Sequence, residues 1–308
     1  MPFLLAIQSA VGQGILWGIM ALGVFITFRL LDIADLTVDG SFATGGAVCA
    51  VALTSGINPF VAILMATVSG FIAGGITGIL HTKFDIPAIL AGILSQIGLY
   101  SINLRIMGRS NIPLLNTPNL FKDFPIGGLS NNWIVLIIGL VIAVVIIMIS
   151  YWFFGTELGS AIRATGNNEK MVRSLGVNTN STKIIGLMIS NGLIALSGGL
   201  VTQAQGYADI KMGIGAIVMA LASIVIGEVL ISKGTNFMVT LAAIISGSII
   251  YRIIITLVLQ AGLSTDDLKL FTAILVAVAL AIPTYLAKRR QVTTYKKMTK
   301  ELEDAETK

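Results

Sequence analysis

The side chains that could do chemistry are few, and six polar or ionisable ones lie inside long apolar runs. They are Asp39, Gln96, Asn103, Gln203, Glu228 and Arg252. Within a membrane, an ionisable group is costly unless it pairs, binds a proton or ion, or lines a polar pathway. The six residues are therefore candidates for a pathway or gating role. The alternatives are a structural ion pair for Arg252 and a side chain that reaches the membrane surface for Glu228.

Three carboxylates lie close together in LLDIADLTVDGSFATGG, between two apolar runs: Asp32, Asp35 and Asp39. Asp39 stands directly before Gly40, Ser41 and an apolar stretch. This spacing is typical of a helix start, where a carboxylate stabilises the N-terminal dipole. Capping is one interpretation of Asp39, and a lining or gating role in an interrupted helix is the other.

A polar and basic segment, RATGNNEKMVRSLGVNTNSTK at residues 163–183, separates two other apolar runs. An asparagine can cap a short helix here, and a glycine can end it in the left-handed conformation. On this helix we expect Met171, Val172 and Leu175 to share one face, which suits docking into a groove of another protein. The alternative is a plain basic loop on the cytoplasmic side. The residues of the expected docking helix are Asn168, Lys170, Met171, Arg173, Ser174, Leu175 and Gly176.

Other kinds of site lack their motifs. The sequence has no GxxxxGK[ST] phosphate-binding loop, so this chain is not expected to bind ATP in that manner. It has no HExxH motif and no CxxC pair, so we expect no metal or cofactor site. Cys49 and His81 are far apart in the sequence, which makes a catalytic thiol pair improbable. We expect no catalytic residues and no nucleic-acid partner.

The composition indicates the kind of element that must position these groups. Of 308 residues, 55% are hydrophobic and only 11% are charged, and the mean hydropathy is +0.91. A soluble domain carries about twice this charged fraction. The apolar runs are continuous rather than alternating, and the 33 glycines suit closely packed helices. The sequence therefore predicts an all-α integral membrane protein.

About nine runs are long enough to cross the bilayer as helices. They lie at 9–30, 38–56, 59–80, 86–104, 132–154, 184–205, 212–231, 236–260 and 268–287. Residues 1–287 then form one transmembrane domain, with a polar loop at about 155–183 and a proline- and glycine-rich loop at about 105–131. A charged tail follows at 288–308.

The distribution of lysine and arginine predicts the orientation of this domain. With the basic tail in the cytoplasm, alternation of the spans also places the 155–183 loop there, and most basic residues then face inward. We therefore expect an external N-terminus, a cytoplasmic C-terminus and an external 105–131 loop.

Two spans differ in what they are expected to contact. Gly70, Gly74 and Gly78 follow at four-residue spacing and share one helix face, which indicates close packing against another helix. The 132–154 span is almost entirely leucine and β-branched residues, so we expect it to face membrane lipid.

Two stretches resemble a known family. GTELGSAIRATGNNEKMVRSLGVNTNSTKIIGLMISNGLIALSGGL is similar to the cytoplasmic loop and following helix of permease subunits in the branched-chain amino acid family of ATP-binding cassette importers. GILWGIMALGVFITFRLLDIADLTVDGSFATGGAV resembles that family's opening pair of helices. The resemblance extends from about Gly12 to Pro283. Two departures, Met171-Val172 and the stretch from Thr37 to Gly40, resemble a side branch paired with lipoprotein-type binding proteins, some of them for aromatic amino acids.

The resemblance implies a larger assembly in a bacterial plasma membrane. Two permease chains, expected to be identical, would form a pathway at their interface. Two separate ATPase subunits, which bind ATP and magnesium, would grip the short helix of residues 168–176, and an extracellular lipoprotein would deliver an amino acid or similar small polar solute. The alternatives are a sugar or nucleoside permease of the same superfamily, or a stand-alone ion-coupled transporter using carboxylates such as Asp39 or Glu228.

Overall fold

The computed structural model is an almost entirely helical bundle, and it describes residues 2–115, 117–121, 131–231, 236–262, 267, 270–278 and 281. Six of the described helices are long and apolar enough to cross a membrane. They are α1 with its π-helical end η1 (Pro2–Phe25 and Ile26–Leu30), α3 (Pro59–Lys83), α4 (Ala88–Met107), α5 (Asn131–Gly155), α8 (Thr179–Gln205) and α10 (Phe237–Gln260). Two further apolar helices are shorter: α2 (Val38–Thr54) and α9 (Ala216–Leu230).

These eight helices occupy the first eight expected spans. Their ends differ by a few residues, because local caps rather than hydropathy end a helix: Gly108 follows α4 and Gly206 follows α8 as C-caps, both with positive φ. Of the ninth expected span, only residues 267, 270–278 and 281 are described, and 270–278 are helical. The tail at 288–308 lies outside the described residues.

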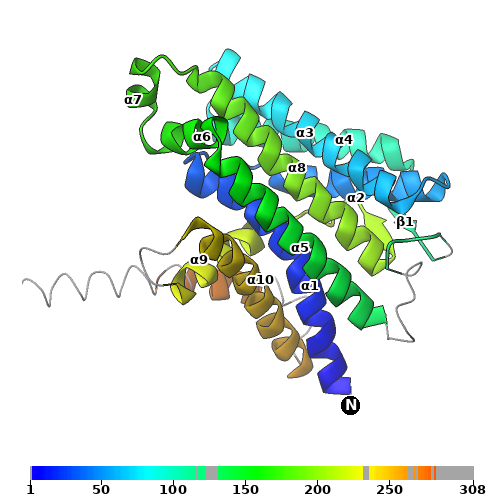
Figure 1. Ribbon diagram of the computed structural model, residues 1–308. Helices are drawn as coiled ribbons and strands as arrows, with labels where there is room; N and C mark the ends of the chain where they lie inside the picture. The colour runs from blue at the N-terminus through cyan, green and yellow to red at the C-terminus, as the bar shows by residue number, and fades with distance from the viewer. Residues whose placement is uncertain are drawn as a thin grey trace, which may run out of the picture.

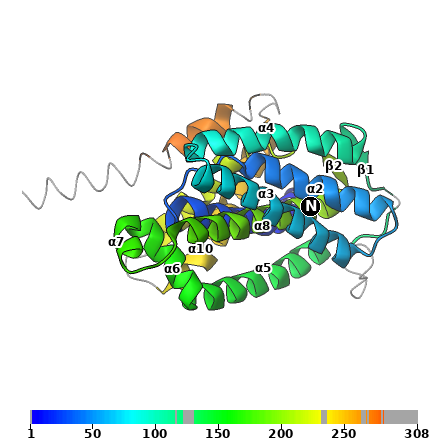
Figure 2. The same cartoon turned by 90° about the horizontal axis from the view of Figure 1, so that it is seen from above.

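Helix α8 lies at the centre of the bundle, in contact with α1, α2 and α3. Seen from above, α4 and α5 lie on opposite flanks of this group (Figure 2). Helix α5 buries a face against α1 and exposes large apolar side chains on its other side, as expected for a helix that faces lipid. Helices α9 and α10 pack on each other and on α1.

The α3–α8 contact is made by the glycine face of α3. A Cβ atom at Gly70 would overlap the carbonyl oxygen of Asn191, and one at Gly74 would overlap that of Leu187. At Gly78 the Cβ would lie 3.0 Å from Cα of Ile184. The absence of side chains at these positions lets the two backbones approach closely, which is how helices gain packing energy in lipid.

The first two helices are joined by an irregular segment that turns back into the bundle. Residues 31–37 are not helical, and Asp32 adopts a positive φ of 55°. Asp35 and Thr37 are nonetheless buried, and Asn191, near the middle of α8, donates from Nδ2 to Asp35 Oδ2 at 2.8 Å. Irregular backbone at this depth is tolerated only where protein or a cavity surrounds it. Helix α2 therefore begins inside the bundle rather than at its surface.

At the end of the bundle opposite α7, the loop after α4 contains a short strand (Figure 1). Strand β1 (Asn111–Pro113) pairs antiparallel with β2 (Tyr207–Asp209) beside the helices, and this short pairing leaves the predicted all-α class confirmed. The expected loop at 105–131 begins three residues later, because α4 continues to Met107. Residues 122–130 of this loop lie outside the described part of the chain.

Candidate functional site

The polar segment forms two short helices that lie outside the bundle at one end, visible at the upper left of Figure 1. Helix α6 (Glu157–Asn167) begins after Thr156, whose side chain accepts a hydrogen bond from Gly159 N–H. Helix α7 (Glu169–Ser174) follows after a single residue. This segment is therefore structured rather than an open basic loop.

Local side-chain bonds fix both ends of α7. Asn168 Oδ1 accepts from Met171 N–H at 3.1 Å, which caps the N-terminus. At the other end Gly176 adopts a positive φ of 85°, and the Ser174 hydroxyl donates to the carbonyl of Met171 at 2.7 Å. The expected helix between an asparagine and a glycine is therefore present.

Glu169 ties α7 to the start of α8. Its carboxylate accepts hydrogen bonds from Lys183 at 2.7 Å, from Arg173 at 2.8 Å and from the Thr179 hydroxyl at 3.1 Å. The Lys183 ammonium that donates to it, helped by Thr179 and Arg173, lowers the pKa of the Glu169 carboxyl against a smaller opposing effect of burial. A cluster of ion pairs and hydrogen bonds therefore links α7 to the start of α8.

The apolar residues of α7 and of its C-cap, Leu175, do not share one face, contrary to the sequence prediction. Val172 is 2% exposed and points into the protein, whereas Met171 is 47% and Leu175 is 74% exposed. Adjacent residues point about 100° apart on a helix, so Val172 can anchor α7 while Met171 and Leu175 lie outward, one turn apart. Lys170, Arg173 and Ser174 are also exposed. The outward surface of α7 thus combines two large apolar side chains with two cations.

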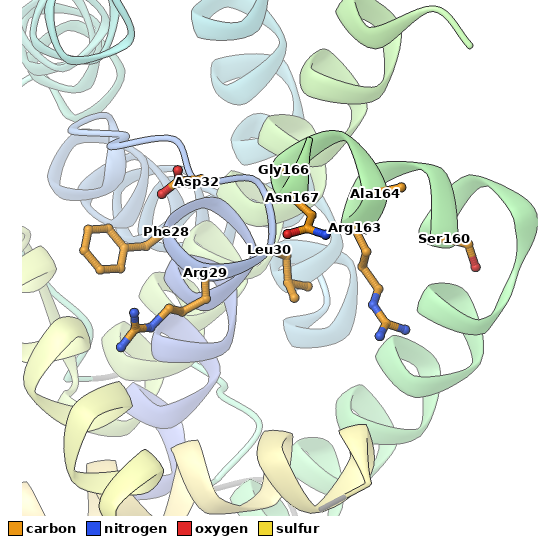
Figure 3. A pocket seen from close by; sticks show the side chains of 9 residues that line it. All are labelled: Phe28, Arg29, Leu30, Asp32, Ser160, Arg163, Ala164, Gly166 and Asn167. Atoms are coloured by element: carbon orange, nitrogen blue, oxygen red, sulfur yellow. The ribbon is translucent and has the colours of Figure 1, made fainter. Parts of the chain in front are cut away.

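Helix α6 lies against the end of α1. A Cβ atom at Gly166 would overlap the carbonyl oxygen of Leu30, so glycine permits this contact. Beside it is a pocket of about 750 Å³, with Arg29 from the end of α1 and Arg163 from α6 on its two sides (Figure 3). The guanidinium of Arg29 pairs with Glu228 of α9, and that of Arg163 lies 5.1 Å from the ring centre of Phe237.

A second site involves three of the six polar candidates named in the sequence analysis. Asp39, Gln96 and Asn103 line one cavity of about 260 Å³ between α2, α4 and the segment before α9. Tyr100, Ile97 and Ile214 also line it. The three polar residues come from two helices, and their convergence could not be read from their spacing in the sequence.

Asp39 caps a different helix from the one expected. Its carboxylate accepts from Gly215 N–H at 2.9 Å and from Ile217 N–H at 3.1 Å, at the N-terminus of α9. Its own helix, α2, begins after Thr37 without a side-chain cap. The sequence indicates the right type of interaction, but the partner lies 176 positions away in the chain.

The other three candidates lie elsewhere. Gln203 is buried and joins the loop after α4 to the start of α3, because it accepts from Leu120 N–H at 2.8 Å and donates to the carbonyl of Pro59 at 3.2 Å. Glu228 pairs with Arg29 at the end of the bundle that carries α6 and α7. The guanidinium of Arg252 lies 4.4 Å from the ring centre of Trp17, which is a cation–π contact.

A buried polar network went unnoticed in the sequence. Asn191 joins Asp35 to the Ser41 hydroxyl, which donates to Asn191 Oδ1 at 2.7 Å. The hydroxyl of Thr37 contacts the hydroxyl of Thr77, which in turn donates to the hydroxyl of Ser95. The available signal was an asparagine in the middle of an apolar run, which calls for a hydrogen-bond partner.

Comparison with known proteins agrees with this architecture. The family model described as "Branched-chain amino acid transport system / permease component" matches residues 6–283. A "Tyrosine transport system permease protein" of Clostridioides difficile is 48% identical over 89% of this chain and 90% of its own length. An autoinducer 2 import system permease protein of Yersinia pseudotuberculosis is 33% identical over 52% of this chain and 46% of its own length.

Among solved structures, a chain of "PsaBC from Streptococcus pneumoniae in complex with Fab" is similar, with a TM-score of 0.50 and 17% identity. The similarity covers 88% of this chain and 90% of that chain, and it concerns the fold alone. The family match spans nearly all of the helical bundle, from the first helix to the last apolar run. This chain belongs to the family of branched-chain amino acid transport system permease components, and it is a multi-pass protein of the bacterial cell membrane.

Proposed function

We propose that the chain is the membrane-spanning subunit of an ATP-binding cassette importer for an amino acid or similarly small polar solute. The observation that carries the proposal is the outward surface of α7 and its C-cap, where Met171 and Leu175 are exposed and Glu169 links the helix to α8 by an ion pair with Lys183. Two exposed apolar side chains flanked by cations suit a groove on a soluble partner. A helix tied to the bundle can transmit that partner's motion to the membrane.

The partner in this proposal is an ATPase. Two ATPase subunits bind ATP and magnesium, and each grips one α7 helix of a permease pair, which we propose to be a homodimer. An extracellular lipoprotein delivers the solute to the other face. The coupling helix consists of residues 168–176, and ATPase closure shifts the permeases between outward-open and inward-open states.

The proposed topology follows from this assignment. With α6 and α7 in the cytoplasm, alternating spans place the N-terminus outside, and the charged tail at 288–308 inside. Helices α2 and α9 and the last apolar run, 268–287, complete nine spans within a transmembrane domain of residues 1–287. The shortness of α2 and α9 suits helices that begin inside the bundle.

An amino acid is the substrate that we favour. The relative that is 48% identical carries the name of a tyrosine transport permease, and it covers most of this chain. A sugar or nucleoside is the alternative within the superfamily. The autoinducer 2 relative is similar over only half of this chain, so it carries less weight for substrate class.

Reconstitution tests the proposal directly. The tagged permease is purified from its native membrane, the proteins that accompany it are identified, and the complex is placed in liposomes with the binding lipoprotein outside. We expect an ATPase with a phosphate-binding loop to co-purify and tyrosine uptake to require internal Mg-ATP. Uptake driven by an ion gradient in liposomes that contain this chain alone would instead establish a secondary transporter.

A further inference from the structure

The cavity between α2 and α4 has an unusual electrostatic character. Asp39 is the one charged side chain among the residues that line it, and no lysine, arginine or histidine lies there. The N-terminus of α9 would by itself attract an anion, since its free amides point outward. The Asp39 carboxylate already occupies those amides, through Gly215 and Ile217. The helix end offsets about half a charge, so about half of a negative charge remains at the cavity wall when the Asp39 carboxylate is ionised.

Asn103 adds a second hydrogen-bond acceptor to the cavity wall, and unlike Asp39 it has no donor among the described residues. Its side chain is 1% exposed and lines the cavity, yet its Oδ1 accepts no hydrogen bond from any described residue. A buried carbonyl oxygen normally has a donor, because leaving it unpaired costs free energy. A donor brought by a bound molecule would satisfy it.

The rest of the wall is apolar or aromatic. Ile97, Tyr100 and Ile214 line the cavity and are also exposed on the surface of this chain. With a volume of about 260 Å³, the cavity lies just below the range of roughly 300–1,000 Å³ that is typical of ligand sites. It suits a small molecule with one cationic end and one apolar end.

We propose that this cavity binds the protonated amine of the transported solute, with the Asp39 carboxylate and the Asn103 amide oxygen as acceptors. The apolar part of the solute contacts Ile97 and Tyr100. The proposal rests on the proposed function, because it makes this chain, and not only the binding lipoprotein, select for an amino compound. Gln96 provides a further hydrogen-bonding group in the same wall.

The test uses cysteine labelling in membrane vesicles that contain the permease and its co-expressed ATPase. Cys49, the single cysteine of the sequence, is buried, so a maleimide should react mainly with an introduced cysteine. Ile97→Cys places that cysteine at a position where the side chain is 63% exposed. Ile214→Cys provides a second labelling position. The probes are tyramine, which has the amine and no carboxylate, and 3-(4-hydroxyphenyl)propionate, which has the carboxylate and no amine.

We expect tyramine to slow labelling several-fold and the propionate to leave it unchanged. In Asn103→Leu, the tyramine concentration that halves the labelling rate should rise by about 10- to 100-fold. This is the loss of affinity expected when one hydrogen bond to a charged group is removed. Asn103→Asp should retain protection, and Ser101→Ala, an exposed position on α4, is the matched control.

Equal protection by both probes, no protection by tyramine at either position, or full protection in Asn103→Leu would overturn the proposal. Tyrosine uptake by the same vesicles, with the binding lipoprotein added on the outer side and Mg-ATP inside, separates this result from the proposed function. Uptake without protection by tyramine refutes the amine site alone. Protection without ATP-dependent uptake refutes the importer and leaves the amine site standing.

Discussion

Leu175→Glu should abolish transport while leaving the permease folded. Leu175 is 74% exposed, so this chain gains little from burying it. Full burial of a leucine side chain contributes about 1.5–3 kcal/mol, and the buried quarter therefore contributes less than about 1 kcal/mol to folding. Membrane insertion and the thermal stability of the purified permease should remain close to wild type.

The exposed remainder is what an ATPase groove could bury. Three quarters of the same range is about 1.1–2.2 kcal/mol, so Leu175→Ala should weaken ATPase binding by about 6- to 40-fold. Leu175→Glu should weaken it further, because a carboxylate must then be desolvated in the groove. The assay is co-purification of the ATPase together with ATP-dependent uptake in proteoliposomes.

Val172→Ala is the matched control, because Val172 belongs to the same helix and is buried. This variant should loosen α7 and reduce permease stability, with the exposed side chains of Met171 and Leu175 still present. If Leu175→Glu and Met171→Glu both support normal ATP-dependent uptake, α7 is not the coupling helix. If they fail to insert, the exposure of these side chains has been misinterpreted.

Three further predictions concern packing, the ion pair and pH. Gly74→Ala should disrupt the α3–α8 contact and yield aggregated protein in detergent size-exclusion chromatography, whereas Gly98→Ala, with no atom within 4 Å of its added Cβ, should elute normally. Glu228→Gln should change stability by less than about 1 kcal/mol, since its pair with Arg29 is partly exposed, and should preserve ATP-driven uptake; loss of uptake with intact ATPase binding would favour an ion-coupling role. Because its pKa is lowered, Glu169 should stabilise α7 above the usual glutamate pKa of about 4.3 and lose that effect as the pH falls through the lowered value. Faster amide exchange of α7 in Glu169→Gln at neutral pH, corrected for intrinsic rates, checks this, and unchanged exchange would contradict it.

Local features were predictable from the sequence because they depend on neighbouring residues. An apolar run of about 20 residues predicts a membrane-spanning helix whatever that helix packs against. Asn168 and Gly176 mark the ends of α7, since a cap involves groups only a few positions apart. Even here one detail was wrong: the inward direction of Val172 depends on what α7 packs against.

Contacts between distant segments were decided by the tertiary structure. The sequence indicates that Asp39 can cap a helix, but the helix that it caps is decided by the packing of α9 against α2. Gln96 and Asn103 are two turns apart on α4, yet the cavity that they share with Asp39 exists because residues 31–37 turn back into the bundle. Sequence by itself determined the membrane class, the long apolar helices and the two ends of α7, all set by local hydrogen bonding and hydropathy. Which polar groups meet was decided by helix packing, because glycine faces and loop paths bring together residues that are far apart along the chain.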